Sequence, residues 1–284
     1  MATIKELLLE SKGRLQKVNI PSYSLDADLL MAHAINSSRE DVFLNRERQL
    51  SQQQETIFND LIKRRESREP MSHIVGKREF WGMEFKVTKD TLDPRPDSES
   101  LIEQVLHIYK DKKPPKKIID FGTGTGCLLL TLLSEFKEAE GVGVDKSKGA
   151  ILVAEENSKK LELAKRVSFV VSNWGENVKG EYDLIISNPP YIRNNDIEGL
   201  EPEVSNYEPK DALDGGNSGL ECYIDLAPDL FRLLSNGGFA VLEHGVGQEA
   251  DVKKILENNN LNFVSYKKDL AGINRCVTVK KQHA

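Results

Sequence analysis

The run Asn188-Pro189-Pro190-Tyr191 follows an apolar stretch, residues 182–186, that has the composition of a buried strand. Two adjacent prolines cannot continue a sheet, because neither has an N–H to donate to a neighbouring strand. The strand should therefore end here and present an amide side chain, carbonyl oxygens and a phenol ring. Such acceptors suit a planar –NH₂ group with two protons to donate. These four residues are the candidate substrate site, and Asn188, Pro189 and Tyr191 are the candidate catalytic residues.

A glycine-rich turn lies between an expected strand, residues 118–121, and an expected helix that begins at Cys127. Alternating glycines let a ligand approach the backbone closely, and the helix behind offers free N–H groups. A dinucleotide fingerprint has the spacing G-x-G-x-x-G, whereas this turn has G-x-G-x-G. The tighter spacing favours a mononucleoside-type ligand whose tail carries a carboxylate and an amine. The turn comprises Gly122, Thr123, Gly124, Thr125 and Gly126.

Two other expected strands end in residues that could hold a nucleoside. Asp145 ends the next strand, where a carboxylate can accept hydrogen bonds from two ribose hydroxyls; capping of the following helix is its alternative role. Asn173 can hydrogen-bond an adenine amine, and Trp174 can pack on the adenine unless it belongs to the core. Ligands of parallel α/β sheets bind outside the carboxyl ends of the strands. We therefore expect these residues to meet the glycine-rich turn and Asn188 at one edge.

The elements that must position these residues fall into two classes. From residue 116 onward, strands and helices alternate, which is typical of a mostly parallel sheet covered by helices on both faces. Residues 1–70 show helical periodicity instead, with caps expected at Ser24 and Ser51. The sequence thus predicts a small helical bundle followed by an α/β domain.

A short segment joins the helical region to the α/β region. Residues 78–87 alternate around a central glycine as a β-hairpin does, and Asp97 or Ser98 is expected to cap the next helix. We predict a helical domain over 1–75, a hairpin and linker over 76–97, and an α/β domain over 98–284.

Composition and charge narrow the function classes. The 284 residues carry a net charge of −6, with 39% hydrophobic and 30% charged residues. Residues 1–75 contain equal numbers of basic and acidic side chains, which argues against a duplex-binding module built on phosphate contacts. The three cysteines are far apart and form no C-x-x-C pair, so we expect no metal site and a reducing cytoplasm. We expect no signal peptide, because the N-terminal residues turn charged at once, and no membrane span, because no apolar run approaches about 20 residues.

The motifs together resemble a known group of enzymes. G-x-G-x-G, Asp145 and N-P-P-Y are similar to those of the class I S-adenosylmethionine-dependent methyltransferases that act on planar amine nitrogens. That group includes N6-adenine DNA methyltransferases and protein glutamine N5-methyltransferases. N-P-P-Y does not choose between adenine and glutamine, because both offer a flat –NH₂.

Other segments favour glutamine, because they resemble the peptide chain release factor glutamine methyltransferases (the HemK/PrmC family). They are residues 70–76, 78–82, 94–99, 183–192, 207–213 and 237–245. The likeness covers nearly the full length. The related ribosomal-protein glutamine methyltransferases share N-P-P-Y but usually lack R-P-D-[ST]-E, which stands here at 95–99. They are one alternative, and an N6-adenine nucleic-acid methyltransferase, which should carry a basic recognition segment, is the other.

The resemblance implies a seven-stranded sheet with its last strand antiparallel, preceded by a helical bundle and a β-hairpin. It implies methyl transfer from S-adenosylmethionine to the glutamine of the Gly-Gly-Gln loop of class-one release factors, with the helical domain recognising that partner. The implied cofactor contacts are Gly122 to Gly126, Asp145, Trp174 and Asn188, and the amide would be held by Asn188 to Tyr191. Nothing in the sequence demands more than a monomer.

We expect the site to act by positioning the substrate amide. The Asn188 side-chain oxygen and the Pro189 carbonyl would accept the two amide protons, and Tyr191 would pack against the amide plane. Glu243 and His244 also end a strand, so they too could face the substrate. Three residues depart from the family pattern: Asp93 replaces an aliphatic residue, Asn173 an Asp and Phe121 a Leu.

Overall fold

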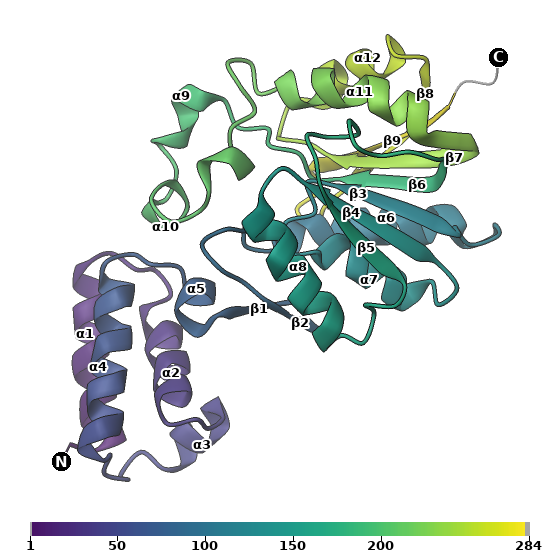
Figure 1. Ribbon diagram of the computed structural model, residues 1–284. Coiled ribbons are helices and arrows are strands. Elements are labelled where there is room, and N and C mark those ends of the chain that lie inside the picture. Colours follow the sequence, from purple (N-terminus) through teal and green to yellow (C-terminus); the bar gives the residue numbers. More distant parts are fainter. Residues whose placement is uncertain (1, 282–284) are drawn as a thin grey trace. The chain divides into compact units, whose positions relative to one another are not determined.

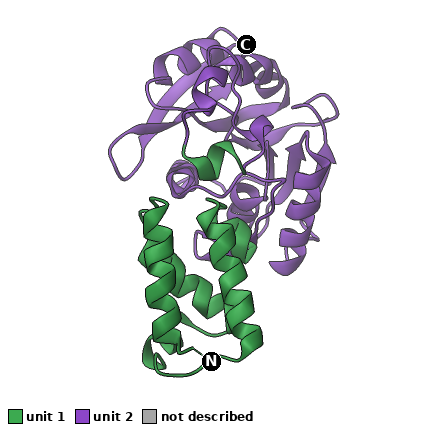
Figure 2. Ribbon diagram, turned by 90° about the vertical axis from the view of Figure 1, so that its left-hand side faces the viewer, with its two compact units in different colours: residues 1–76, 201–207 green, residues 77–200, 208–284 purple. Residues whose placement is uncertain are grey.

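The computed structural model describes residues 2–281. The chain divides into two compact units, which Figure 2 shows in different colours. Residues 1–76 and 201–207 form the helical unit, and residues 77–200 and 208–284 form the α/β unit. The helical unit is therefore discontinuous, because seven residues from the second half of the chain complete it.

The helical unit packs its helices around one apolar core, whose fully buried members include Ile4, Leu30, Phe58 and Ile62. The amphipathic spacing of the sequence explains this core, since each long helix contributes one apolar face. The helices are α1 (Ile4–Lys17), α2 (Tyr23–Ala34), α3 (Arg39–Leu44), α4 (Gln52–Glu66), α5 (Met71–Val75) and α10 (Pro202–Ser205).

Serine caps begin several of these helices. The expected cap at Ser51 is confirmed: its hydroxyl accepts from the Gln54 N–H in a complete capping box. The expected cap at Ser24 is wrong, because α2 begins one residue earlier and Ser22 occupies the N-cap position. The Ser22 hydroxyl donates to Asp26 at 2.9 Å rather than accepting from a backbone N–H.

The segment 201–207 joins the helical unit through charged contacts at the end of α4. Arg65 is only 5% exposed and contacts Asp26 and Glu203, both at 2.8 Å. Arg68 contacts Glu203 at 2.6 Å. The basic end of α4 thus pairs with acidic residues rather than remaining a solvated helix end.

The α/β unit is built on a seven-stranded sheet with the order β5-β4-β3-β6-β7-β9-β8 (Figure 1). The first five strands of that order are parallel, and β9 runs antiparallel to both of its neighbours. The strands are β3 (Lys117–Phe121), β4 (Glu140–Asp145), β5 (Val167–Val171), β6 (Tyr182–Ser187), β7 (Leu234–Glu243), β8 (Leu261–Lys268) and β9 (Asn274–Lys281), and a separate hairpin pairs β1 (Lys77–Phe80) with β2 (Met83–Lys86). The predicted sheet and hairpin are confirmed.

Helices cover both faces of this sheet (Figure 1). Alternate strand residues enter two separate cores: Ile118 packs with α6 and α7, whereas Ile119 packs with α11 and α12. The helices are η1 (Pro96–Ser98), α6 (Glu99–Tyr109), α7 (Cys127–Glu135), α8 (Lys148–Lys160), α9 (Asn194–Ile197), η2 (Lys210–Ala212), α11 (Glu221–Leu233) and α12 (Glu249–Glu257).

Strand register brings the predicted motifs to one edge. Phe121 at the end of β3 lies opposite Val144 of β4 on one side and Ser187 of β6 on the other. The residues that follow these three positions are the glycine-rich turn, Asp145 and Asn188. They therefore gather at the carboxyl edge, as the sequence predicts for a parallel sheet.

Candidate active site

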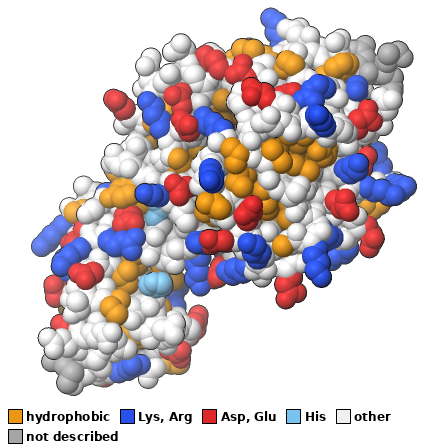
Figure 3. All heavy atoms as spheres, viewed as in Figure 1, with side chains coloured by type: hydrophobic (Ala, Val, Ile, Leu, Met, Phe, Trp, Pro, Cys, Tyr) orange, Lys and Arg blue, Asp and Glu red, His pale blue; other side chains and the backbone are white. Residues whose placement is uncertain are grey.

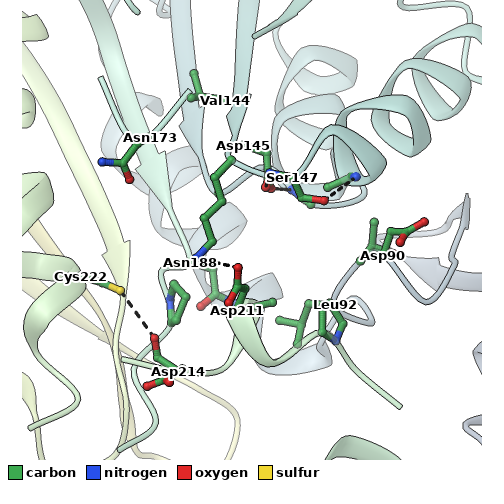
Figure 4. Close-up of a pocket in the computed structure, with 18 of the residues that line it drawn as sticks. Asp90, Leu92, Val144, Asp145, Ser147, Asn173, Asn188, Asp211, Asp214 and Cys222 are labelled. Carbon is green, nitrogen blue, oxygen red and sulfur yellow. Dashed lines mark hydrogen bonds and ion pairs between the residues drawn. The ribbon is translucent and has the colours of Figure 1, made fainter. Parts of the chain in front are cut away.

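A cavity of about 430 Å³ lies at the carboxyl ends of β3, β4, β5 and β6 (Figure 4). This volume falls within the range of about 300–1,000 Å³ typical of small-molecule sites. Its walls come from the glycine-rich turn, the β4–α8 connection and the residues that follow β5 and β6. Residues 89–92, 209–212 and 214 also line it, as do Ala150 of α8 and Cys222 and Asp225 of α11.

Gly122 and Gly124 form a cradle on the cavity wall. Their φ values are +71° and +54°, in the left-handed region that favours glycine. A Cβ on either residue would meet no protein atom beyond its chain neighbours closer than 3.9 Å, so it would project into open space. The missing side chains thus leave room for a ligand to contact the backbone.

The other three residues of the turn shape it and do not line the cavity. A Cβ on Gly126 would press on side chains of α7 and α8 at 3.1 and 3.3 Å. The Thr123 hydroxyl donates to Asp120 at 2.7 Å, and the Thr125 hydroxyl accepts from the Cys127 N–H at 3.3 Å. Their predicted contact with the cofactor therefore has no cavity surface to support it, whereas their role in the turn is evident.

Asp145 lies on the cavity wall with both carboxylate oxygens oriented by the backbone. One oxygen accepts from the Gly124 N–H and the other from the Ser147 N–H, each at 2.9 Å. Burial raises the pKa of Asp145, and these N–H groups partly offset that effect. Each oxygen keeps a lone pair for a ligand hydroxyl. Ser147, not Asp145, occupies the N-cap position of α8.

Asn173 and Trp174 follow β5 and line the same cavity. The Asn173 amide donates to Glu176 at 2.8 Å, which leaves its oxygen to accept from a ligand amine. Trp174 also packs edge-on against Phe121, with ring centroids 6.5 Å apart. The indole therefore packs against the apolar core and also lines the cavity, and its packing on an adenine stays a prediction.

The candidate substrate residues divide between the cavity and the core. Asn188 and Pro190 line the cavity, whereas Pro189 is buried beside it. Tyr191 is half-buried against the apolar cluster of α11 and α12, and its hydroxyl donates to Glu243 at 3.3 Å. The Asn188 side-chain nitrogen donates to the Ser98 hydroxyl at 3.1 Å.

Glycines pack tightly around the backbone of Tyr191. A Cβ on Gly215 would lie 2.8 Å from the Tyr191 Cα, and one on Gly219 would lie 2.6 Å from the Tyr191 carbonyl oxygen. Gln248 donates to that same oxygen at 3.0 Å. The segment after β6 is therefore held rigidly, which suits a site that works by positioning.

The sequence reasoning missed several residues of the site. Asp120 lies one residue before the end of β3, and burial raises its pKa to about 7. An acidic residue two positions before the first glycine was the available signal. Segments 89–92 and 209–214 carry no comparable signal in the sequence. Within the second of them, Asp211 forms an ion pair with Lys146 at 3.1 Å on the cavity wall (Figure 4).

Glu243 at the end of β7 and His244 directly after it are buried and lie away from the cavity. Glu243 is 1% exposed and accepts from Ser98 at 2.5 Å and from Tyr191. His244 is fully buried, and its Nδ1 donates to the Gly245 carbonyl at 3.0 Å. Neither residue lines the cavity. Neither is therefore placed to contact a ligand there.

The cavity fits the nucleoside with an amino-acid tail that the sequence predicts. The glycine cradle leaves backbone space, Asp145 offers acceptors for ribose hydroxyls, and Asn173 with Trp174 offers an acceptor and a ring for a base. The residues present therefore suit S-adenosylmethionine.

Surface charge, candidate metal ligands and helix hydropathy bear on other protein classes. On the face shown in Figure 3, basic and acidic side chains are interspersed over the described residues. Among residues 2–281, no group of three or more His, Cys, Asp or Glu residues is arranged to hold a metal ion. No helix in that part of the chain is long and apolar enough to cross a membrane.

Comparison with known proteins agrees with the geometry. Family models for the PrmC N-terminal domain and the methyltransferase small domain match residues 6–76 and 95–200. The release factor glutamine methyltransferase of Rhodospirillum rubrum is 41% identical over 98% of this chain and 85% of that protein. The one of Agrobacterium fabrum is 36% identical over 99% and 98%.

A solved structure supports the fold alone. The hMettl16 catalytic domain, crystallised in complex with a MAT2A 3′UTR hairpin, has a TM-score of 0.59 at 17% identity, over 79% of this chain and 83% of that one. The sequence relatives, by contrast, match in both units and across the candidate active site. The chain therefore belongs to the release factor glutamine methyltransferase family.

Proposed function

We propose that this protein transfers a methyl group from S-adenosylmethionine to the side-chain amide nitrogen (N5) of the glutamine in the Gly-Gly-Gln motif of class-one peptide chain release factors. One observation carries the proposal: Asn188 lines the same cavity as the glycine cradle and Asp145, so an amide bound by Asn188 would lie beside the methyl donor. The names of the curated relatives support a release factor as the substrate.

The proposed chemistry depends on how the chain holds the amide. An amide nitrogen is a poor nucleophile, because its lone pair is delocalised into the carbonyl group. The Asn188 side-chain oxygen and the Pro189 carbonyl accept its two protons, and Tyr191 supports the amide plane. Orientation of this kind can account for several kcal/mol of the barrier, and aimed dipoles add electrostatic stabilisation. The released proton passes through these acceptors to water.

Cofactor binding in this proposal uses the cavity wall. Gly122 and Gly124 give the backbone contact, Asp145 accepts from the ribose hydroxyls, and Asn173 with Trp174 holds the adenine. Thr123, Thr125 and Gly126 keep the turn in shape. S-adenosylmethionine, when bound, supplies an electrophilic methyl group on a sulfonium.

The helical domain, residues 1–75, is proposed to recognise the release factor. We further propose that the enzyme is a cytoplasmic monomer without stable nucleic-acid binding. The neutral charge balance of residues 1–75 supports the absence of nucleic-acid binding, and the sparse cysteines support a reducing compartment.

A methyl-transfer assay with four acceptors tests the function. Labelled S-adenosylmethionine is offered with a release factor, the same factor with its loop Gln changed to Ala, ribosomal protein and duplex DNA. Label is expected on the intact release factor alone. Label on ribosomal protein or on DNA in its place would establish the corresponding alternative, a ribosomal-protein glutamine methyltransferase or an N6-adenine methyltransferase, and refute the proposal.

A further inference from the structure

A continuous hydrogen-bond chain runs from the substrate site into the protein interior. The Asn188 Nδ2 donates to Ser98 Oγ at 3.1 Å, and Ser98 Oγ donates to Glu243 Oε2 at 2.5 Å. The Tyr191 hydroxyl donates to Glu243 Oε1 at 3.3 Å. One carboxylate thus reaches both polar side chains of the substrate motif, one directly and one through a serine.

The middle of this hydrogen-bond chain is buried and does not line the cavity. Ser98 is 3% exposed and Glu243 1% exposed, and neither lines the cavity. Ser98 occupies the N-cap position of α6 but makes no capping hydrogen bond with its side chain. Its hydroxyl is therefore not used to stabilise the helix, although the sequence predicted that role.

The charge of Glu243 sets the direction of every hydrogen bond in the chain. An ionised carboxylate only accepts, so both hydroxyls must donate to it. Having donated its one proton, the Ser98 hydroxyl can only accept from Asn188. The Asn188 amide must then turn its nitrogen toward Ser98 and its oxygen toward the cavity. That is the orientation in which Asn188 can accept a proton from a substrate amide.

We propose that Ser98 and Glu243 are positioning residues that hold the Asn188 amide oxygen toward the substrate and fix the Tyr191 ring. This inference rests on the proposed function. Neither residue contacts the substrate, and both act through the hydrogen bonds of the motif. The serine and the strand-end glutamate are thus part of the amide-recognition device.

Protonation of Glu243 should switch the device off. Burial raises the pKa of this carboxyl to about 7, while the hydrogen bonds from Ser98 and Tyr191 lower it. Below that pH a protonated carboxyl must donate, so one hydroxyl is forced to accept and the chain loses its fixed direction. The titratable and charged groups around Glu243 are Asp97 before α6, Cys127 of α7, Tyr191 after β6, Tyr223 of α11, His244 after β7, and Arg275 and Cys276 of β9.

Three single variants test the chain against a matched control. Ser98→Ala removes the link, Glu243→Gln replaces an acceptor with a donor as protonation does, and Tyr191→Phe removes only the hydroxyl. Ser100→Ala is the control, because Ser100 is also a buried serine at the start of α6 but contacts Cys276 at 3.4 Å. Thermal melting and calorimetric titration with S-adenosylhomocysteine report folding and cofactor binding separately from turnover.

The expected result is a loss of kcat without a loss of cofactor affinity. Ser98→Ala and Glu243→Gln should lower kcat by about 10²-fold, the scale of a small misplacement at a reacting centre, whereas Ser100→Ala should match the wild type. The wild-type kcat should fall as pH drops below about 7, and Glu243→Gln should be low and independent of pH there. The double variant Ser98→Ala/Glu243→Gln should lose no more kcat than the less active of the two single variants, because both changes break the same hydrogen-bond chain.

The outcomes separate this inference from the proposed function. If wild-type enzyme methylates no release factor, the proposed function fails first. If wild-type enzyme is active but Ser98→Ala keeps the kcat and the pH profile of Ser100→Ala, the positioning role is refuted. It is equally refuted if the losses follow melting temperature or cofactor affinity and not kcat.

Discussion

Arg95 donates to Glu208 across 2.6 Å, and this ion pair ties the proline-rich segment before α6 to the segment that forms one cavity wall. The Glu208 side chain is only 2% exposed, whereas that of Arg95 is 34% exposed. Burial raises the pKa of Glu208 to about 7 despite the attraction of Arg95. The pair therefore stabilises a charge that would otherwise be costly to bury.

Loss of Arg95 should destabilise the protein in a pH-dependent way. With a pKa near 7 in the folded state and 4.5 as the ordinary value, Glu208 contributes stability that is lost as pH rises through that window. Arg95→Ala should therefore cost about 1–3 kcal/mol at pH 8, where the carboxylate is charged and left without its partner, and less at pH 5.5. Urea unfolding at the two pH values measures the difference.

Two further variants serve as controls for that measurement. Glu208→Gln removes the charge, so Arg95→Ala added to it should cost little at either pH. Lys267→Ala breaks an ion pair with Glu103 on the surface and should cost less than about 1 kcal/mol. An equal loss for Arg95→Ala at both pH values would show that the charge of Glu208 is not the cause.

Asp145→Asn should weaken cofactor binding. The new amide would place N–H protons against the Gly124 or Ser147 N–H and remove the charge that strengthens hydrogen bonds to a hydroxyl. A loss of about 1.5–3 kcal/mol corresponds to an affinity about 10–100-fold lower. Calorimetric titration with S-adenosylhomocysteine gives the value. Asp211→Asn, an exposed residue of the same cavity, is the control and should bind nearly as well as the wild type.

Gly124→Ala should lose both stability and cofactor affinity, because its Cβ would enter the cavity at a positive φ. Backbone strain of this kind costs about 1–2 kcal/mol. Gly180→Ala separates the two effects: Gly180 has φ +98° and open space around its missing Cβ, but it does not line the cavity. It should melt lower while binding S-adenosylhomocysteine normally. Normal binding by Gly124→Ala would contradict the cradle.

Glu203→Ala should loosen residues 201–207. Glu203 contacts both Arg65 and Arg68, and its side chain is 18% exposed, whereas Glu201 contacts Arg68 with a side chain that is 77% exposed. Hydrogen exchange of the amides in this segment should be faster by about tenfold or more if even 1.4 kcal/mol of local stability is lost. Glu201→Ala should change exchange far less. Similar exchange in both variants would show that the buried pair does not hold the segment.

The parts of the site that could be predicted are those where chemistry lies directly after a strand. Asp145 ends a parallel strand, Gly122 and Asn188 each directly follow one, and the rule for parallel sheets brings the three together without any knowledge of packing. Their residue types then indicate the ligand. Local patterns and one topological rule were therefore sufficient to gather these three residues at one edge of the sheet.

The remaining contacts depend on packing between distant segments. Ser98 is separated from Asn188 by 90 residues and from Glu243 by 145. Ser98 was expected to cap a helix, since a serine at a helix start usually does, but the buried carboxylate competes successfully for its hydroxyl. Residues 209–214 carry no periodicity that would indicate a cavity wall. Only the folded chain reveals these contacts.

The discontinuous helical unit limits how this protein can be dissected. A fragment that ends at residue 76 would lack 201–207, and Arg65, only 5% exposed in the full chain, would face an empty place where Glu203 stood. The reciprocal fragment would carry Glu201 and Glu203 without the arginines that neutralise them. The two units are therefore not interchangeable modules that recombination could exchange at one junction, and a grafted helical domain would need its own matching acidic segment inside the catalytic sequence.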